Sequence, residues 1–322
     1  MVKILISTSS FDPESAGLTG LCKARGYEIV MNPHGRRLTE NEVRALLDPE
    51  VVGMVAGVEP LTRAVLAAAS GLRVISRCGI GMDSVDLQAT REFGIRVFNS
   101  PDAPSTAVAE LTVALMLDAL HRVSEADRAV RNGLWQPLMG RLLRGKTVGL
   151  IGYGRIGRKV SQLVQAFEAR VIAHDVACPA SEPGVVLCDL DQLLSTADIV
   201  SLHIPYADSN RHLLNAARLA MMRPGAILIN ASRGGLVDEA ALLDAVESGR
   251  VAAVALDTFE SEPYHGPLAK LSQVVLTAHM GSYAREARSL MEREAATNLV
   301  RGLSECGLVD REAVHALAGR ET

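Results

Sequence analysis

Three polar residues in the second half of the chain are of the types that acid binding and proton transfer require. Arg233 follows the apolar run AILINAS, Glu262 follows VAAVALD, and His279 follows QVVLT. In an open α/β sheet, ligands bind beyond the carboxyl ends of the strands, so residues in these positions can meet at one site. An arginine can hold a carboxylate through two hydrogen bonds, and a histidine beside a glutamate can exchange a proton. Together they suit the interconversion of a 2-hydroxy acid and a 2-keto acid.

Each of the three residues also has a structural explanation. Arg233 lies in a Ser-Arg-Gly-Gly turn and could cap a helix. Glu262 precedes a proline and could be a solvated loop acid, and an isolated histidine such as His279 is often a hydrogen-bonded part of the structure. Their combination with a nucleotide-binding motif favours the catalytic interpretation.

That motif is Gly152-x-Gly154-x-x-Gly157, which follows the strand-like run TVGLIG and opens a helix-like run over residues 155–167. In this context the first glycine permits a tight turn, the second admits a pyrophosphate, and the third lets helix and strand pack closely. The free N–H groups and the dipole of the helix start would favour the phosphates. The alternative is a helix-packing turn without a nucleotide.

The next strand-like run, RVIAHD, ends at Asp175, eighteen residues after Gly157. A carboxylate in this position can accept hydrogen bonds from both ribose hydroxyls of an adenosine and would repel a 2′-phosphate. No arginine follows within the next several positions to offset that repulsion. The pattern therefore predicts NAD rather than NADP as the cofactor, and its alternative is a surface aspartate.

Short apolar runs alternate with helix-like segments through most of the chain. The first four runs are VKILIS, YEIVM, VVGMVA and LRVIS, and the helix-like segments between them include residues 39–47 and 61–69. Later runs are TVGLIG, RVIAHD, DIVSLH, AILIN, VAAVALD and QVVLT. Runs that are apolar throughout are typical of strands buried on both faces, so the alternation predicts parallel sheets in an α/β fold.

Two irregular segments divide this alternation. Residues 99–105 (NSPDAPS) contain two prolines and lead into a helix-like run over residues 103–121. The segment HMGSYARE precedes a final helix over about residues 285–303, which has no strand of its own to cover and is expected to return to the first domain. We therefore expect two domains, residues 1–100 with 286–322 and residues 101–285.

The composition excludes several functions. The 322 residues include 33 basic and 37 acidic ones, a net charge of −4, and only 3% are aromatic, which argues against nucleic-acid binding. The longest apolar stretch, residues 103–120, contains Glu110 and Asp118 and is too polar for a membrane span. Five cysteines form no C-x-x-C pair, so we expect reduced thiols in the cytoplasm and no metal site.

The chain resembles the D-isomer-specific 2-hydroxyacid dehydrogenases over about residues 51–303. The resemblance rests on SRCGIGMDSVD, PDAPSTAVAELT, GKTVGLIGYGRIG, NASRGGLVDEAAL, ALDTFESEP and HMGS. It implies two Rossmann-like doubly wound parallel-sheet domains with the active site in a cleft between them. The first domain would bind the substrate and the second NAD, and Arg233, Glu262 and His279 match the catalytic positions. Family members are usually homodimers joined through the NAD-binding domain, and residues 103–121 and the Trp135 segment match that contact, although Trp135 could also be a core residue.

The resemblance also implies binding residues. The turn of Arg77, Cys78, Gly79 and Ile80 matches a loop whose backbone N–H groups hold the substrate carboxylate, and it could also be a plain strand-to-helix turn. Besides the three glycines and Asp175, the implied cofactor positions are Val108, Arg155, Ile156, Ile204, Pro205, Ala231, Ser232, Arg233, Asp257, His279 and Gly281. Val108 could equally be a core residue. The residues without a matching role, which are expected to be structural or at the surface, are His203, His212 and His265.

Within this family, PDAPSTAVAEL and GGLVDEAALLDAV are most similar to the D-3-phosphoglycerate dehydrogenases, so D-3-phosphoglycerate is the first substrate expected. Residues 57–62 contain no basic residue for its phosphate, however, which leaves Arg77 as one candidate cation. Glyoxylate or hydroxypyruvate, D-lactate-type acids, and phosphonate or sugar acids are alternatives. Formate dehydrogenases of the family have a glutamine where this chain has Glu262. An NAD-sensing corepressor-like scaffold is a further alternative, because such relatives can retain the three catalytic residues.

Overall fold

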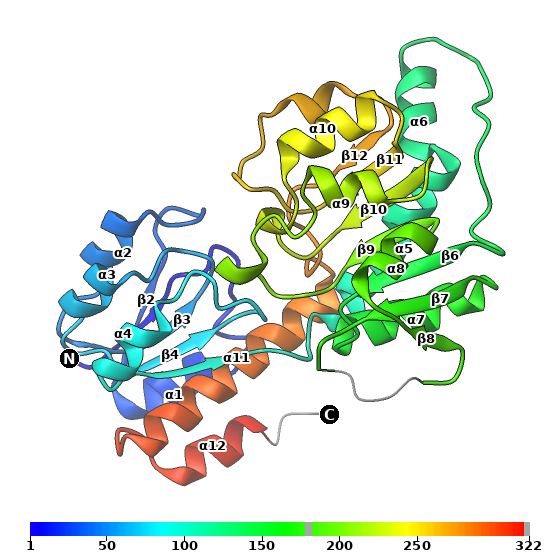
Figure 1. Cartoon of the computed structure of the whole chain (residues 1–322). Coiled ribbons are helices and arrows are strands. Elements are labelled where there is room, and N and C mark those ends of the chain that lie inside the picture. The colour runs from blue at the N-terminus through cyan, green and yellow to red at the C-terminus, as the bar shows by residue number, and fades with distance from the viewer. Residues whose placement is uncertain (178–181, 319–322) are drawn as a thin grey trace. The chain divides into compact units, whose positions relative to one another are not determined.

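The computed structural model describes residues 1–177 and 182–318, so Cys178 lies outside the described residues. The chain divides into two compact units (Figure 1). Unit 1 consists of Met1–Pro104 and Ala284–Thr322, and unit 2 consists of Ser105–Tyr283. Unit 1 is therefore built from both ends of the chain.

Unit 1 contains a five-stranded parallel sheet in the order β2-β1-β3-β4-β5. The strands are β1 (Lys3–Ile6), β2 (Glu28–Met31), β3 (Val51–Ala56), β4 (Val74–Arg77) and β5 (Arg96–Asn99). The chain moves from β1 to β2 in one direction and then returns to place β3 on the other side of β1. The winding of this sheet therefore reverses between β1 and β3, which is where such sheets bind ligands.

The helices of unit 1 cover both faces of this sheet. They are α1 (Leu18–Arg25), α2 (Glu40–Leu46), α3 (Arg63–Ala68), α4 (Leu87–Glu92), α11 (Arg285–Glu305) and α12 (Arg311–Ala318). One core joins Ile4 and Ile6 of β1 to α1, α11 and α12, and the other joins Leu5 to α2, α3 and α4. Gly53 in β3 makes room for α11, because a Cβ there would lie 2.9 Å from Cδ1 of Leu299.

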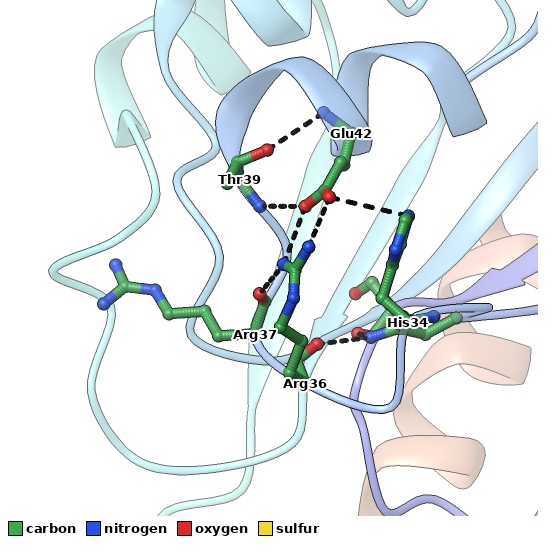
Figure 2. A network of polar contacts seen from close by, with 7 residues as sticks. His34, Arg36, Arg37, Thr39 and Glu42 are labelled. Carbon is green, nitrogen blue, oxygen red and sulfur yellow. Dashed lines mark hydrogen bonds and ion pairs between the residues drawn. The ribbon is translucent and has the colours of Figure 1, made fainter. Parts of the chain in front are cut away.

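The start of α2 is tied to the loop that follows β2 (Figure 2). The Thr39 side chain accepts a hydrogen bond from the N–H of Glu42, whose carboxylate accepts one from the N–H of Thr39 at 2.8 Å. The same carboxylate accepts two hydrogen bonds from Arg36, at 2.6 and 3.0 Å, and lies 3.6 Å from Nε2 of His34. The bonds from the Arg36 guanidinium hold the pKa of Glu42 down to about 2. Arg37 points away from this network.

Unit 2 contains a seven-stranded parallel sheet in the order β12-β11-β10-β9-β6-β7-β8. The strands are β6 (Thr147–Ile151), β7 (Arg170–His174), β8 (Val185–Leu187), β9 (Ile199–Leu202), β10 (Ala226–Asn230), β11 (Val251–Leu256) and β12 (Val274–Leu276). Its winding reverses between β6 and β9. This order is that of a dinucleotide-binding sheet.

Helices also cover both faces of the second sheet. They are α5 (Ser105–His121), α6 (Val123–Arg131), α7 (Arg155–Ala166), α8 (Leu190–Thr196), α9 (Ala216–Met221) and α10 (Glu239–Glu247), with short 3-10 turns η1 (Asp208–Asn210), η2 (Gly234–Leu236) and η3 (Pro267–Lys270). Alternate residues of one strand enter different cores. Leu150 packs with α5 and α7, and Ile151 packs with α8, α9 and α10.

The predicted fold class, two doubly wound parallel sheets with helices on both faces, is confirmed. Several boundaries differ. The helix expected over residues 61–69 begins at Arg63, because Leu61 bonds to Ser84 at 2.7 Å and Thr62 caps the helix. The final helix extends to Glu305.

Trp135 is not a core residue, because this residue is 89% exposed. It lies in an irregular segment that follows α6, together with Met139, which is equally exposed. Leu134 and Leu142 are exposed as well, and α6 has no buried residue. We call residues 123–142 the apolar arm.

No helix within residues 1–177 and 182–318 has the length and apolar character needed to cross a bilayer. The same residues contain no group of three histidine, cysteine, aspartate or glutamate side chains placed to hold a metal ion.

Candidate active site

The glycine motif forms the turn between β6 and α7, and its three glycines have different surroundings. Gly152 has φ of 100°, and a Cβ there would lie 2.6 Å from the carbonyl oxygen of His203. A Cβ on Gly157 would lie 2.3 Å from the carbonyl oxygen of Gly152. By contrast, no described atom lies within 4 Å of the corresponding position at Gly154. The turn is therefore packed at its first and third glycines and open at the second, as pyrophosphate binding requires.

The start of α7 offers backbone donors beside this opening. Gly154 is the N-cap residue, and it provides no side chain that could accept a hydrogen bond from the first turn. Arg155 and Ile156 are the first two residues of the helix, where N–H groups have no partner within the helix. These groups and the helix dipole fit an anion such as a pyrophosphate.

Asp175 follows β7 and lies directly beside the glycine turn. Its Oδ2 accepts a hydrogen bond from the N–H of Tyr153 at 2.7 Å, and its Oδ1 accepts one from the N–H of Ala177 at 2.7 Å. A carboxylate oxygen can accept more than one hydrogen bond, and a carboxylate at this strand end is in the position that binds ribose hydroxyls in dinucleotide-binding sheets. The geometry fits the adenosine end of NAD.

Ile204 and Pro205 follow β9, across the reversal point from the glycine turn. A Cβ on Gly152 would lie 2.7 Å from Cγ2 of Ile204, so the two segments are in close contact. The hydroxyl of Ser232 donates to the carbonyl oxygen of Ile204, which joins this segment to Ala231 and Ser232 after β10.

The turn that carries Arg233 is held by the buried side chain of Asn230 at the end of β10. Asn230 donates to the carbonyl oxygen of Arg233 at 2.9 Å and accepts from the N–H of Ser232 at 3.1 Å. The next residue, Gly234, packs directly on the loop that follows β11, because a Cβ there would lie 1.8 Å from the carbonyl carbon of Phe259. The Arg233 turn therefore contacts the loop that bears Glu262.

Glu262 and His279 form a direct hydrogen-bonded pair. Nδ1 of His279 lies 2.9 Å from Oε2 of Glu262 and 3.1 Å from Oε1. Oε1 of Glu262 also accepts a hydrogen bond from the N–H of Phe259 at 3.1 Å, which holds the carboxylate in place. Because Nδ1 faces the carboxylate, Nε2 of His279 is the nitrogen available to a substrate. Residues from two separate strand ends thus form one acid–base pair.

His279 has φ of 51°, a left-handed backbone conformation that is uncommon for a residue with a side chain. The buried carboxylate of Asp257, 1% exposed, holds the turn around it. Oδ1 accepts hydrogen bonds from the hydroxyl of Thr277 at 2.6 Å and the N–H of Met280 at 2.8 Å, and Oδ2 accepts one from the N–H of Gly281 at 2.8 Å. Thr277 was not predicted from the sequence as part of this site. It directly follows β12, and residues directly after strand ends are where ligand sites of such sheets lie.

Val108 on α5 lies beside the same turn. A Cβ on Gly281 would lie 3.4 Å from Cγ2 of Val108 and 3.2 Å from Oδ2 of Asp257. Val108 is buried, so its side chain packs against the turn that follows His279.

The expected substrate turn follows β4 in unit 1. Gly79 has φ of 148°, and a Cβ there would lie 2.7 Å from Nη1 of Arg77, which donates to the carbonyl oxygen of Cys78. The side chain of Asn99 donates to the carbonyl oxygen of Ile80 at 2.9 Å. Burial raises the pKa of the Cys78 thiol to about 11, so this residue is a buried thiol and not a reactive one.

The histidines without an expected role have distinct surroundings. His203 is partly buried against the glycine turn, with Nε2 2.9 Å from the hydroxyl of Ser201, and desolvation of its ring lowers its pKa to about 4. His212 lies 3.1 Å from Oε2 of Glu260, and His265 is exposed.

Comparisons with known proteins agree with this geometry. Residues 113–281 match the family model described as "D-isomer specific 2-hydroxyacid dehydrogenase, NAD binding domain". The chain is 38% identical over 272 residues to a hydroxypyruvate reductase of Thermotoga maritima, which covers 81% of this chain and 89% of the relative. It is 40% identical over 249 residues to a D-3-phosphoglycerate dehydrogenase of Archaeoglobus fulgidus, covering 74% of this chain and 47% of the relative. This chain therefore spans about half the length of that enzyme.

A solved structure gives the same result for the whole fold. The crystal structure of the TT0316 protein from Thermus thermophilus superimposes with a TM-score of 0.87 at 36% sequence identity, covering 94% of this chain and 97% of that one. The matched NAD-binding segment lies within unit 2, where the open glycine turn and the His279–Glu262 pair are found. The chain belongs to the D-isomer specific 2-hydroxyacid dehydrogenase family and is an NAD-dependent oxidoreductase.

Proposed function

We propose that this protein interconverts a small D-2-hydroxy acid and its 2-keto acid, with His279, Glu262 and Arg233 as its catalytic residues. The observation that supports this most directly is the 2.9 Å contact between His279 and Glu262 in the unit that also contains the open glycine turn. A surface histidine would not need an oriented carboxylate and a left-handed backbone, and His279 lies in the unit that carries the glycine turn.

In the proposed mechanism His279 transfers the substrate proton. When bound, the nicotinamide cofactor would supply the hydride chemistry at C2 of the substrate, as acceptor in oxidation and as donor in reduction. During oxidation, Nε2 of His279 takes the hydroxyl proton, and during reduction it gives a proton to the carbonyl oxygen. Glu262 accepts the hydrogen bond from Nδ1, fixes the ring orientation and stabilises the charged imidazolium.

Arg233 is proposed to hold the substrate carboxylate and carbonyl oxygen through its guanidinium. Unit 1 is proposed as the substrate-binding domain and unit 2 as the NAD-binding domain. In unit 1 the turn of Arg77, Cys78, Gly79 and Ile80 is proposed to hold the carboxylate. The N–H groups of Cys78 and Gly79 already donate to the carbonyl oxygens of Ala56 and Arg77, at 2.9 Å each, so the N–H of Ile80 is the donor proposed for it. Glycine at position 79 permits the φ of 148° of this turn and leaves room for the Arg77 guanidinium, 2.7 Å from where a Cβ would lie.

The cofactor contacts are proposed along the carboxyl ends of the strands of unit 2. Gly152, Gly154, Gly157, Arg155 and Ile156 would bind the pyrophosphate, and Asp175 the ribose hydroxyls. The proposed contacts to the adenosine are Ile204 and Pro205, and those near the nicotinamide are Val108, Ala231, Ser232, Arg233, Asp257, His279 and Gly281.

We propose two candidate hydroxy-acid substrates. The sequence motifs favour D-3-phosphoglycerate. D-glycerate, the hydroxy acid of hydroxypyruvate, is supported by the likeness to the hydroxypyruvate reductase, to which this chain is 38% identical over 272 residues.

The test is NADH oxidation by the purified protein with glyoxylate, pyruvate, hydroxypyruvate and phosphohydroxypyruvate. NADH binding is measured separately by fluorescence. We expect turnover with at least one of these acids. A protein that binds NADH and reduces none of them would contradict the proposed reaction.

We also propose a homodimer joined through unit 2. The apolar arm exposes Leu134, Trp135, Met139 and Leu142 to solvent, and exposed apolar patches of this kind are typical of protein interfaces. The free thiols of Cys22, Cys78, Cys188 and Cys306 support a reducing compartment, and we propose the cytoplasm.

A further inference from the structure

The sheet of unit 1 has a reversal point of its own, between β1 and β3. In open α/β sheets, ligands bind beyond the carboxyl ends of the strands at such a point. Ser7 and Thr8 follow β1, and Gly57, Val58 and Glu59 follow β3. The expected ligand position of unit 1 is therefore flanked by two hydroxyl groups and one carboxylate.

Glu59 is a buried acid at this position. Glu59 is 2% exposed. The Oε1 atom of Glu59 accepts hydrogen bonds from the hydroxyl of Ser7 and from the N–H of Gly57, the latter at 2.9 Å. Within residues 1–177 and 182–318, no hydrogen bond to Oε2 and no ion-pair partner of Glu59 is found. Burying a carboxylate is costly unless donors satisfy it, so Oε2 is suited to a donor from a ligand.

Thr8 provides a second unsatisfied group at the same place. The residue is 8% exposed, and its Oγ1 is buried with no hydrogen-bond partner among the described residues. A Cβ on Gly57 would lie 2.7 Å from Oε2 of Glu59 and 3.5 Å from Cγ2 of Thr8, so both side chains border the same face of Gly57. Buried polar groups in native proteins are normally paired, so the unpartnered Oγ1 of Thr8 beside the carboxylate of Glu59 indicates a binding position.

The charges around this position do not suit a phosphate. Residues 57–62 contain no basic side chain, and Arg77, at the end of the neighbouring strand β4, directs its Nη1 to the carbonyl oxygen of Cys78. Arg36, in the loop after β2, is engaged by both carboxylate oxygens of Glu42, and Arg37 points away from that network (Figure 2). A phosphate beside the Glu59 carboxylate would experience like-charge repulsion, which is strong where water is excluded.

We propose that Glu59 and Thr8 form a subsite for an uncharged hydroxyl group on the far end of the substrate. The hydroxyl donates to Oε2 of Glu59 and accepts from Oγ1 of Thr8. The substrates are then 2-keto and 2-hydroxy acids with a free hydroxyl at C3, and their phosphate esters are excluded. This inference rests on the proposed function, in which unit 1 binds the substrate.

The test compares kcat/KM of the purified protein for hydroxypyruvate, pyruvate and phosphohydroxypyruvate. Pyruvate lacks the C3 hydroxyl, and phosphohydroxypyruvate carries a phosphate on it. We expect hydroxypyruvate to exceed each of the others by about tenfold or more, because a site built for a hydroxyl leaves buried groups unpaired when that hydroxyl is missing. A preference for phosphohydroxypyruvate or an equal rate with pyruvate would overturn the inference.

Two variants test the residues themselves. Glu59→Gln keeps the shape but removes the charged acceptor, and it is expected to lower the hydroxypyruvate-to-pyruvate ratio by about tenfold. Thr8→Val removes the hydroxyl and is expected to lower the ratio by about threefold. A purely structural role would reduce both rates together and leave the ratio unchanged. Glu14→Gln, an exposed acid of the same unit, is the matched control.

The outcomes separate the two proposals. Unchanged ratios in both variants would overturn the subsite while leaving the reaction intact. If the wild type prefers phosphohydroxypyruvate and Arg37→Ala removes that preference, Arg37 and not Glu59 selects the substrate. If the wild type binds NADH and reduces none of the acids, the proposed function itself fails.

Discussion

The residues proposed for cofactor and proton chemistry are few, and two of them are held by backbone contacts. Asp175 is held by the N–H groups of Tyr153 and Ala177, and Glu262 by that of Phe259. Such bonds orient a carboxylate before a ligand arrives, so less freedom is lost on binding. Two predictions follow from single side chains of unit 2.

Replacing Asp175 by alanine should weaken NADH binding more than NADPH binding. The carboxylate favours ribose hydroxyls and repels a 2′-phosphate, so its removal costs NADH hydrogen bonds and relieves NADPH of repulsion. The measurement is the dissociation constant of each nucleotide for wild type and variant, by fluorescence. An equal loss for both would show that Asp175 only supports the glycine turn.

His203 should make the protein less stable as the pH falls from about 7.5 to about 5. Burial lowers its pKa to about 4. The unfolded histidine titrates near 6.5, so between these values the unfolded chain binds a proton that the folded chain does not, and unfolding is favoured. The expected cost to the free energy of unfolding is about 2 kcal/mol.

The measurement for His203 is urea unfolding at both pH values for the wild type and His203→Gln. The variant should lose this part of the pH dependence. His315→Gln, at an exposed position, controls for the loss of a histidine. Identical pH dependence in the wild type and His203→Gln would refute the assignment.

At the scale of elements, strand ends and the turns after them build the site. The glycine turn, the Ile204 segment, the Arg233 turn, the Glu262 loop and the His279 turn follow five strands of one sheet. Parallel strands bring their carboxyl ends to one edge, so residues far apart in sequence become neighbours. Asp257 joins two of these turns through three hydrogen bonds.

Asp257→Asn should therefore disturb the His279 turn. Three donors face its two oxygens, and an amide can accept at only one end, so the variant leaves a buried donor facing another donor. We expect a loss of about 1–3 kcal/mol in the free energy of unfolding and about a tenfold or greater fall in kcat. Urea unfolding and NADH oxidation measure the two effects. Asp244→Asn, exposed on α10, is the matched control, and wild-type stability and turnover in Asp257→Asn would contradict this role.

The sequence allowed most of these turns to be located, because strands buried on both faces form short apolar runs and glycines mark the turns. It did not reveal β5, whose only apolar residues are Val97 and Phe98, or the short helix α12. Nor could it reveal the bonds of Asp257 or the burial of Glu59. Those depend on contacts between segments that are distant in the chain, which local patterns do not encode.

At the scale of the whole molecule, two units have separate cores and one of them bears an exposed apolar arm. Unit 1 uses α11 to close its sheet, with Ser76 bonded to the carbonyl oxygen of Ala295 at 2.8 Å. In unit 2, α6 contains no buried residue, and Trp135 in the segment after this helix is 89% exposed. A second copy of the chain is the partner proposed for this arm.

The wild type should therefore be a dimer, and Trp135→Ser should shift it towards monomer. Light scattering after size-exclusion chromatography, at about micromolar concentration, measures the mass. Large aromatic residues dominate binding energy at interfaces, so one substitution is expected to raise the dimer dissociation constant by about tenfold or more. Val186→Ser removes an exposed apolar side chain outside the arm and is the control. A monomeric wild type would contradict the dimer.

The most direct measurement of the proposed chemistry is the kcat of His279→Ala with the best 2-keto acid of the panel, together with its affinity for NADH. If His279 transfers the substrate proton, kcat falls by about a hundredfold or more while the NADH dissociation constant stays within about threefold of the wild type. A variant that binds NADH and turns over at the wild-type rate would contradict the account.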